Sequence, residues 1–221
     1  MNYVFHFGAI LDRWPEFLYG AWRTMELTVV SSAIGFVIGL AGALARAYGP
    51  LWLRRLVGVY VEIVRNTPLL VQLYFVFFSL PLMGLRLSSD QAAILALSVH
   101  LGAYATEILR AGIEAVPAGQ VEAAKSLGLT RGQIMRLVVI VPALRAVYPS
   151  LTSQFILQLL GTSIVSAIAA EELTAIANNM AMQTFRNFEI YIVIAVIYFV
   201  LVRLCGLAFR LFSHLLFRWK A

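Results

Sequence analysis

Long apolar runs recur along this chain, and they limit its possible folds more than any other feature. A run of about 18 or more apolar residues can cross the hydrocarbon core of a bilayer, about 30 Å thick, as one α-helix. Hydrophobic residues make up 61% of the 221 residues, and no segment between the runs is long enough for a separate soluble domain. We therefore predict an all-α integral membrane protein with one domain over residues 1–221. Five spans fit the sequence, with approximate bounds 22–45, 57–82, 90–113, 137–160 and 188–212.

The basic residues are distributed unevenly over the loops that these spans define. One set of loops carries mainly basic residues. The other set mixes its positive residues with acids, among them Asp12, Glu16, Glu171 and Glu172. Lys and Arg are retained on the cytoplasmic side of membrane proteins with short loops. We therefore expect an external N-terminus and a cytosolic C-terminus. The basic set contains Arg46, Arg54, Arg55, Arg110, Lys125, Arg131, Arg136, Arg210, Arg218 and Lys220.

A polar segment of about 117–136 separates the third and fourth spans. Pro117 precedes a short helix over 118–127, and Gly128 is suited to end it, because glycine adopts the left-handed conformation common at helix ends. Thr130 and Gln133 have the spacing of a capping box at the start of a second helix. We expect Val121, Ala124 and either Leu127 or Gly128 to share one face of the first helix. From composition alone, this cytosolic hairpin either docks a soluble partner or merely joins two spans.

Two further patterns concern how the spans pack. Pro68 lies inside the second span and predicts a kink there, because proline removes a backbone donor and clashes with the preceding turn. Gly35, Gly39 and Gly42 lie about one turn apart in the first span, and small residues let helices approach closely. These glycines fit either a contact with a second copy of the chain or packing inside one subunit.

Charged and polar residues within the spans are candidates for function, because such groups are costly in lipid. Glu62 with Arg65, and Glu107 with Arg110, are three residues apart and predict structural ion pairs near the cytosolic ends of their spans. Uncharged polar residues predict a substrate path, although each could instead bond a neighbouring helix. The candidates for the path are Gln72, His100, Tyr104, Gln154, Gln158, Thr162 and Ser163.

Several motifs together resemble one family of membrane proteins. Gly119, Gln120, Glu122, Ala123 and Ala124, followed by Leu127, Gly128 and Pro142, resemble the cytoplasmic loop of permease subunits of ATP-binding-cassette importers. Residues 64–72 and 104–113 look like the polar amino-acid subfamily, the histidine, glutamine and arginine permeases. The resemblance covers about residues 20–212. The chain departs from that subfamily at 160–163, where Leu-Gly-Thr-Ser replaces a common Lys-Asp-Thr-Ser, and at Asn66, where glycine is usual.

The resemblance implies a type I ABC importer membrane-domain fold, whose coupling helix contacts an ATPase. It implies two ATPase subunits, a second permease subunit, identical or homologous, an extracytoplasmic solute-binding protein, membrane lipid and a polar amino acid as partners, with no nucleic acid. The location would be the bacterial cytoplasmic membrane. The coupling contacts would be Gly119, Gln120, Glu122, Ala123, Ala124, Leu127 and Gly128.

The sequence also bears on the source of energy. It contains no G-x-x-x-x-G-K-[ST] phosphate loop, so we expect a permease without enzymatic activity, cofactor or metal of its own. ATP and Mg²⁺ would be bound by the separate ATPase. The alternative is a gradient-driven carrier or channel that acts without an ATPase, with Glu107 or His100 as its coupling group.

Overall fold

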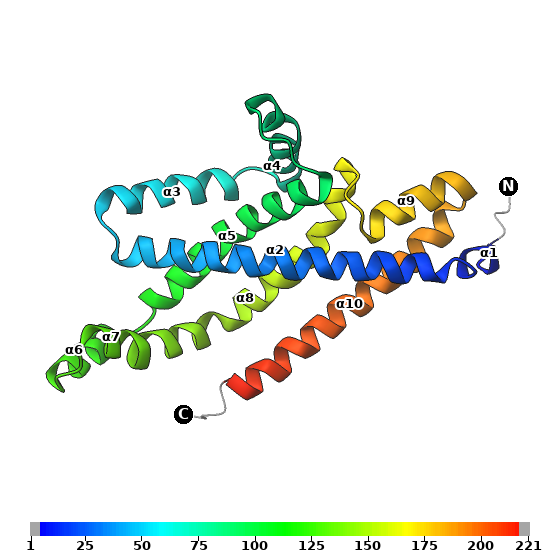
Figure 1. Cartoon of the computed structure of the whole chain (residues 1–221). Coiled ribbons are helices and arrows are strands. Elements are labelled where there is room, and N and C mark those ends of the chain that lie inside the picture. Colours follow the sequence, from blue (N-terminus) through cyan, green and yellow to red (C-terminus); the bar gives the residue numbers. More distant parts are fainter. Residues whose placement is uncertain (1–4, 217–221) are drawn as a thin grey trace. The chain divides into compact units, whose positions relative to one another are not determined.

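The computed structural model describes residues 5–216, and every regular element in that range is helical (Figure 1). This confirms the all-α prediction. Short π-helical or 3₁₀ segments connect or extend the α-helices, namely η1 (Phe75–Ser79), η2 (Pro81–Met83), η3 (Ile134–Ile140) and η4 (Thr162–Ile168). The α-helices are α1 (Gly8–Leu11), α2 (Trp14–Tyr48), α3 (Leu51–Arg65), α4 (Leu69–Tyr74), α5 (Ser89–Glu114), α6 (Ala118–Ser126), α7 (Arg131–Gln133), α8 (Val141–Gly161), α9 (Leu173–Thr184) and α10 (Asn187–Leu216).

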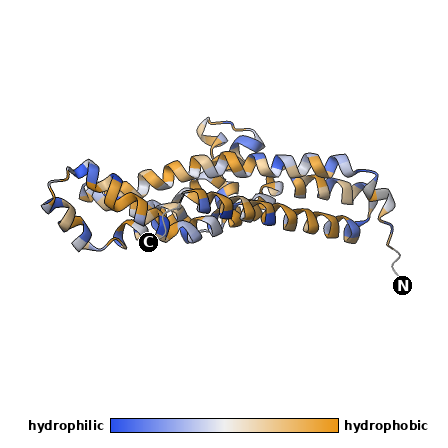
Figure 2. Cartoon of the chain, turned by 90° about the horizontal axis from the view of Figure 1, so that it is seen from below, coloured by the Kyte–Doolittle hydropathy of each residue, from blue (hydrophilic) through white to orange (hydrophobic). Residues whose placement is uncertain are grey.

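Four continuous helices in the described range are long and apolar enough to cross a membrane. The region predicted as the second span consists of two helices, α3 and α4 with its extension, so the count rises to five if this pair forms one span. Figure 2 shows the long helices mostly in the apolar colour. The four continuous spans are Trp14–Tyr48, Ser89–Glu114, Arg131–Ile168 and Asn187–Leu215.

The kink predicted at Pro68 is a complete interruption of the helix. Helix α3 ends at Arg65, and α4 begins only at Leu69. The side chains of Asn66 and Thr67 donate hydrogen bonds of 2.8 and 2.7 Å to carbonyls in the last turn of α3. These bonds satisfy acceptors that the end of a helix leaves open. Since Pro68 has no N–H and disfavours a helical residue before it, the helix cannot continue through this point.

Two π-helical turns each end two residues before a proline. Segment η1 precedes Pro81, and η3 precedes Pro142. A proline ring clashes with the carbonyl four residues earlier in a regular α-helix, and a widened turn relieves such a clash. The helix containing η3 therefore runs without interruption over Arg131–Ile168, well beyond the predicted span of 137–160.

The described residues form two compact units. Unit 1 contains residues 5–32, 69–97 and 156–208, and unit 2 contains 33–68, 98–155 and 209–216. Helices α2, α5, α8 and α10 contribute residues to both units.

The interior of unit 1 has two apolar clusters. One includes Leu27, Leu73 and Leu97, each at most 2% exposed, and the other gathers Phe17 and Met180 around α9. Helix α9 lies between the last two predicted spans. Its first turn is capped by the side chain of Glu172, which accepts hydrogen bonds from Thr174 and Ala175 N–H at 2.9 and 2.8 Å.

In unit 2, glycines let α2 pack closely against α5. A Cβ atom added to Gly39 would lie 2.4 Å from the Cβ of Ala105, and one added to Gly42 would lie 2.4 Å from the Thr106 hydroxyl. Such distances leave no room for a side chain. Of the two alternatives for these glycines, the structure therefore shows packing inside the chain.

Candidate functional site

The polar segment between α5 and α8 folds into a helical hairpin with an apolar core of its own. Helix α6 lies beside α7 and the following turn (Figure 1). Ala124, Ile134 and Val139 are 5 to 6% exposed, and Val121 and Leu129 pack around them. One face of α6 is therefore buried against the start of the next helix, which holds the hairpin together without another protein.

The turn of the hairpin is specified by two consecutive local motifs. Gly128 has a φ of +76°, and its N–H donates to the Lys125 carbonyl at 2.9 Å. The Leu129 N–H donates to the Ala124 carbonyl at 3.2 Å, which completes a Schellman motif. Thr130 then caps the following helix in a capping box with Gln133. Both sequence predictions for this turn, the left-handed glycine and the capping box, are confirmed.

Most of the predicted coupling residues lie on the open face of the hairpin. Gly119, Gln120, Glu122, Ala123 and Gly128 are exposed, while Ala124 is buried in the hairpin core.

Leu127 departs from the expectation that it shares a face with Val121 and Ala124. Its side chain is 79% exposed, because α6 ends at Ser126 and the chain reverses at Gly128, so that Leu129 packs against the core instead.

An ion cluster stabilises the end of α5 that leads into the hairpin. Glu107 accepts hydrogen bonds from Arg46 of α2 and, at 2.7 Å, from Arg110. Arg110 also pairs with Glu114, the last residue of α5, at 2.5 Å. The predicted Glu107–Arg110 pair is confirmed. Arg46 was missed, because it is 61 residues away from Glu107 in sequence.

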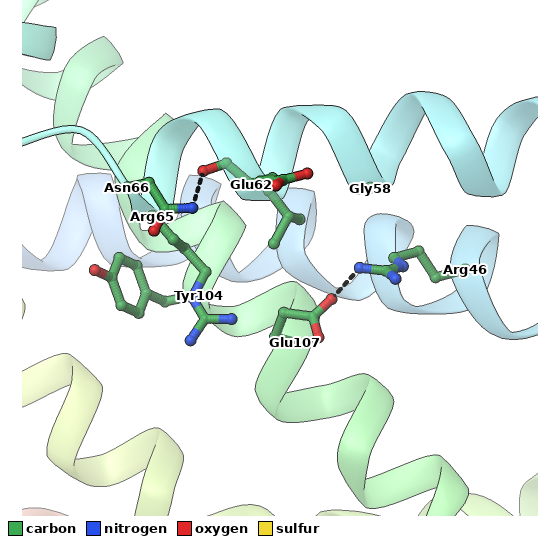
Figure 3. A pocket seen from close by; sticks show the side chains of 8 residues that line it. Arg46, Gly58, Glu62, Arg65, Asn66, Tyr104 and Glu107 are labelled. Atoms are coloured by element: carbon green, nitrogen blue, oxygen red, sulfur yellow. Dashed lines mark hydrogen bonds and ion pairs between the residues drawn. The ribbon is translucent and has the colours of Figure 1, made fainter.

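A cavity of about 430 Å³, which we call the α3–α5 cavity, lies beside this cluster within unit 2. The guanidinium carbon of Arg65 lies 5.2 Å from the centre of the Tyr104 ring (Figure 3). Such a cation–π contact occupies the ring face but leaves the guanidinium hydrogens available. The cavity is lined by Arg46, Gly58, Val61, Glu62, Arg65, Asn66, Tyr104 and Glu107.

The predicted ion pair between Glu62 and Arg65 does not form within residues 5–216. Spacing along α3 allows the pair, but the Arg65 side chain lies over Tyr104 instead. Figure 3 shows Glu62 bonded to Asn66 only through its backbone carbonyl, at 2.8 Å. The α3–α5 cavity thus presents one carboxylate and one guanidinium that are not joined to each other.

Three of the seven residues predicted to form a substrate path belong to unit 2. Tyr104 lines the α3–α5 cavity, and the ring of His100 lies 5.0 Å from the Tyr104 ring, centre to centre. Gln154 is half-buried on α8.

The other four candidates belong to unit 1. Gln158 is 3% exposed and donates to the Leu97 carbonyl at 2.9 Å and to the Ser31 hydroxyl at 3.2 Å. The hydroxyls of Thr162 and Ser163 donate to carbonyls three residues earlier. The contacts of Gln158 are bonds to neighbouring helices, the alternative weighed from the sequence, whereas Thr162 and Ser163 bond within their own helical segment. The remaining candidate, Gln72, is half-buried on α4.

Titratable side chains in the described range form no group of three or more that could hold a metal ion.

Comparisons with known proteins agree with one another. Residues 35–218 match the family model described as "Binding-protein-dependent transport system inner membrane component". The probable glutamine ABC transporter permease protein GlnM of Bacillus subtilis (strain 168) is 36% identical over 197 residues, which cover 88% of this chain and 90% of that protein. The L-cystine transport system permease protein TcyB of the same organism is 35% identical over 209 residues, covering 94% and 89%.

A solved structure shares the fold over nearly its whole length. The crystal structure of an amino acid ABC transporter with histidines aligns with a TM-score of 0.88 and 37% identity, covering 96% of this chain and 99% of that one. The predicted ABC importer membrane-domain fold is thereby confirmed. The relatives are permease subunits of ABC transporters, and the apolar helical spans of this chain agree with such a subunit. This chain belongs to the family of binding-protein-dependent transport system inner membrane components.

Proposed function

We propose that this chain is the membrane-spanning subunit of an ATP-driven importer of a polar amino acid in a bacterial cytoplasmic membrane. Its N-terminus lies outside and its C-terminus in the cytosol, as the basic loops favour. Two ATPase subunits, a second permease subunit and an extracytoplasmic binding protein complete the assembly. The ATPases hold ATP and Mg²⁺, since the 221-residue sequence contains no phosphate loop of its own.

The open face of the hairpin is the observation that carries this proposal. Its apolar core and its two capping motifs keep α6 in one conformation, while Glu122 and Leu127 remain exposed for a partner. Residues 115–117 connect α6 directly to α5, and the helix of Arg131–Ile168 begins only a few residues after α6. A displacement of α6 by an ATPase is therefore passed to two membrane spans.

The α3–α5 cavity supports the choice of substrate. A free amino acid carries one carboxylate and one ammonium group, and the cavity offers the guanidinium of Arg65 and the carboxylate of Glu62. Its volume of about 430 Å³ lies in the range usual for small-molecule sites. We propose that this cavity is one section of the substrate path and that Tyr104 keeps Arg65 in place there.

The test of coupling uses the assembled transporter in vesicles. Glu122→Lys and Gly128→Val are expected to reduce ATP-driven uptake at least about tenfold while ATP hydrolysis continues, a loss equivalent to about 1.4 kcal/mol of coupling free energy. The control is Asp12→Lys, which reverses an exposed charge before α2 and should leave uptake unchanged. Normal uptake in both hairpin variants would contradict the docking role.

A second measurement separates this function from its alternative. A gradient-driven carrier or channel would transport the amino acid in vesicles that contain the chain but no ATPase. We expect no uptake under that condition, with or without an ion gradient. Uptake that stops when the ion gradient is dissipated and does not depend on ATP would refute the proposal of an ATP-driven importer.

A further inference from the structure

A second cavity of unit 2, which we call the α8–α10 cavity, has a volume of about 330 Å³ and a different chemical character. Its charged and polar side chains all offer hydrogen-bond donors, and no carboxylate lines it. The residues that matter for its chemistry are Tyr148 and Thr152 of α8 and Phe209, Arg210, Ser213 and His214 of α10.

Donors in this cavity remain available for a ligand. Arg210 has no carboxylate within ion-pair distance among residues 5–216. The Thr152 hydroxyl is buried near that of Tyr148, but it makes no hydrogen bond of acceptable geometry with any described residue. Tyr148 itself donates to the Phe209 carbonyl at 2.6 Å. A buried hydroxyl without a partner is costly unless a ligand or water satisfies it.

Apolar side chains surround the cavity, and further basic residues follow α10 in the sequence. Phe209 stacks on Phe155 with ring centres 5.6 Å apart. Leu211 and Leu215 of α10 are 57% and 70% exposed, as expected for side chains that face lipid. Arg218 and Lys220 follow α10 in the sequence and lie outside the described residues.

We propose that the α8–α10 cavity binds the phosphate of an anionic phospholipid of the cytoplasmic leaflet. Arg210 donates to the phosphate oxygens, while His214, Ser213 and Thr152 supply further donors. The acyl chains lie along the exposed leucines of α10. Basic pockets between membrane helices on the cytoplasmic side bind anionic headgroups in this way. The choice of leaflet rests on the orientation given in the proposed function, whereas the phosphate chemistry does not.

Native mass spectrometry of the full-length chain in detergent, with phosphatidylglycerol or phosphatidylcholine added, tests this site. The wild-type chain is expected to retain phosphatidylglycerol preferentially, and Arg210→Gln to lower that retention about fivefold, since one basic residue near a charged headgroup contributes about that factor. The matched control is Arg203→Gln. Arg203 lies on the same helix, 5.0 Å from the Phe199 ring, and does not line the cavity. Equal retention in the wild type and in Arg210→Gln would overturn the site, as would equal retention of phosphatidylcholine.

Two further arms separate the alternatives. Inorganic phosphate alone should not displace the lipid at millimolar concentration; displacement would make a free phosphate compound the occupant and overturn the lipid assignment. Ser213→Asp places a carboxylate in the cavity and should abolish retention while the unfolding temperature stays unchanged. This variant keeps the test decisive if Arg210→Gln fails to fold. Lipid retention is measured without transport, so a failure here is distinct from a failure of the importer proposal.

Discussion

The α3–α5 and α8–α10 cavities are close in size, about 430 and 330 Å³, but they differ in the balance of charge around them. Two guanidinium groups and two carboxylates line the α3–α5 cavity, whereas the α8–α10 cavity is lined by Arg210, His214 and neutral polar or apolar groups. The first arrangement suits a molecule that carries both charges, and the second suits an anion. Charge balance, rather than volume, distinguishes what each cavity can hold.

The largest effect is expected from breaking the ion cluster beside the α3–α5 cavity. Glu107→Ala leaves Arg46 and Arg110 without their shared carboxylate, which is 17% exposed. Removing one partner of a half-buried charge cluster should lower the free energy of unfolding by about 2 to 3 kcal/mol. Denaturation of the purified chain in detergent would measure this loss. Glu114→Ala is the control, since that side chain is 58% exposed and should contribute less than about 1 kcal/mol.

The next effect concerns the separate charges of the α3–α5 cavity. Arg65→Gln should raise the KM for uptake about tenfold, equivalent to about 1.4 kcal/mol, because it removes the cation available to a substrate carboxylate. Uptake kinetics in vesicles measure this change, with Arg55→Gln on the same helix as the control. A lower maximal rate with an unchanged KM would show instead that Arg65 has only a structural role. Lipid retention at the α8–α10 cavity should remain normal in both variants.

Ionic strength should affect the two cavities unequally. Raising salt from 0.1 to 1 M shortens the screening length from about 10 to about 3 Å. Arg210 is exposed and without an ion-pair partner among the described residues, so retention of an anionic lipid should fall by roughly half or more. The Glu107 cluster makes direct contacts and is partly shielded, so the unfolding temperature should change little. Equal sensitivity of both properties would remove the distinction between the cavities.

The smallest effect comes from a carboxylate outside both cavities. Glu172 is fully buried and is held by neutral donors only, including the Tyr198 hydroxyl at 2.7 Å. Burial raises the pKa of Glu172 above its ordinary value of 4.5. The folded state therefore binds this proton more tightly than the unfolded state, and its contribution to stability, full below pH 4.5, is lost as pH rises through the raised pKa.

Glu172→Gln should remove that part of the pH dependence. The free energy of unfolding of the wild type, measured from pH 4.5 upward, should fall with pH relative to that of the variant, because only the wild type must ionise a buried carboxyl. Parallel curves across the range would mean that the neutral donors fully compensate for the burial of the charge.

Features specified by adjacent residues could be predicted from the sequence. The left-handed Gly128 and the capping box of Thr130 depend on backbone bonds that span only a few residues. The apolar spans were likewise predictable, because lipid imposes helical backbone and apolar side chains on any segment that crosses it. The extent of the helix break at Pro68 could not be predicted from the sequence, because it depends on capping by the side chains of Asn66 and Thr67.

Features that depend on distant parts of the chain could not be predicted. Arg65 has an acid at a suitable spacing on its own helix, but its side chain lies over a tyrosine of α5. Gln158 was a candidate for substrate contact until the structure placed Leu97 and Ser31 within hydrogen-bond distance. No local signal in a single sequence distinguishes a polar side chain that bonds a helix from one that lines a path. The roles of the hairpin and cavity residues therefore remain predictions.

The Schellman motif and the capping box around Gly128 affect how readily another protein can associate with the hairpin. Because both helix ends are already satisfied by internal hydrogen bonds, the chain loses little conformational entropy when it is bound. Association should then show the small heat-capacity change of preformed surfaces, and its rate should not be limited by folding of the hairpin.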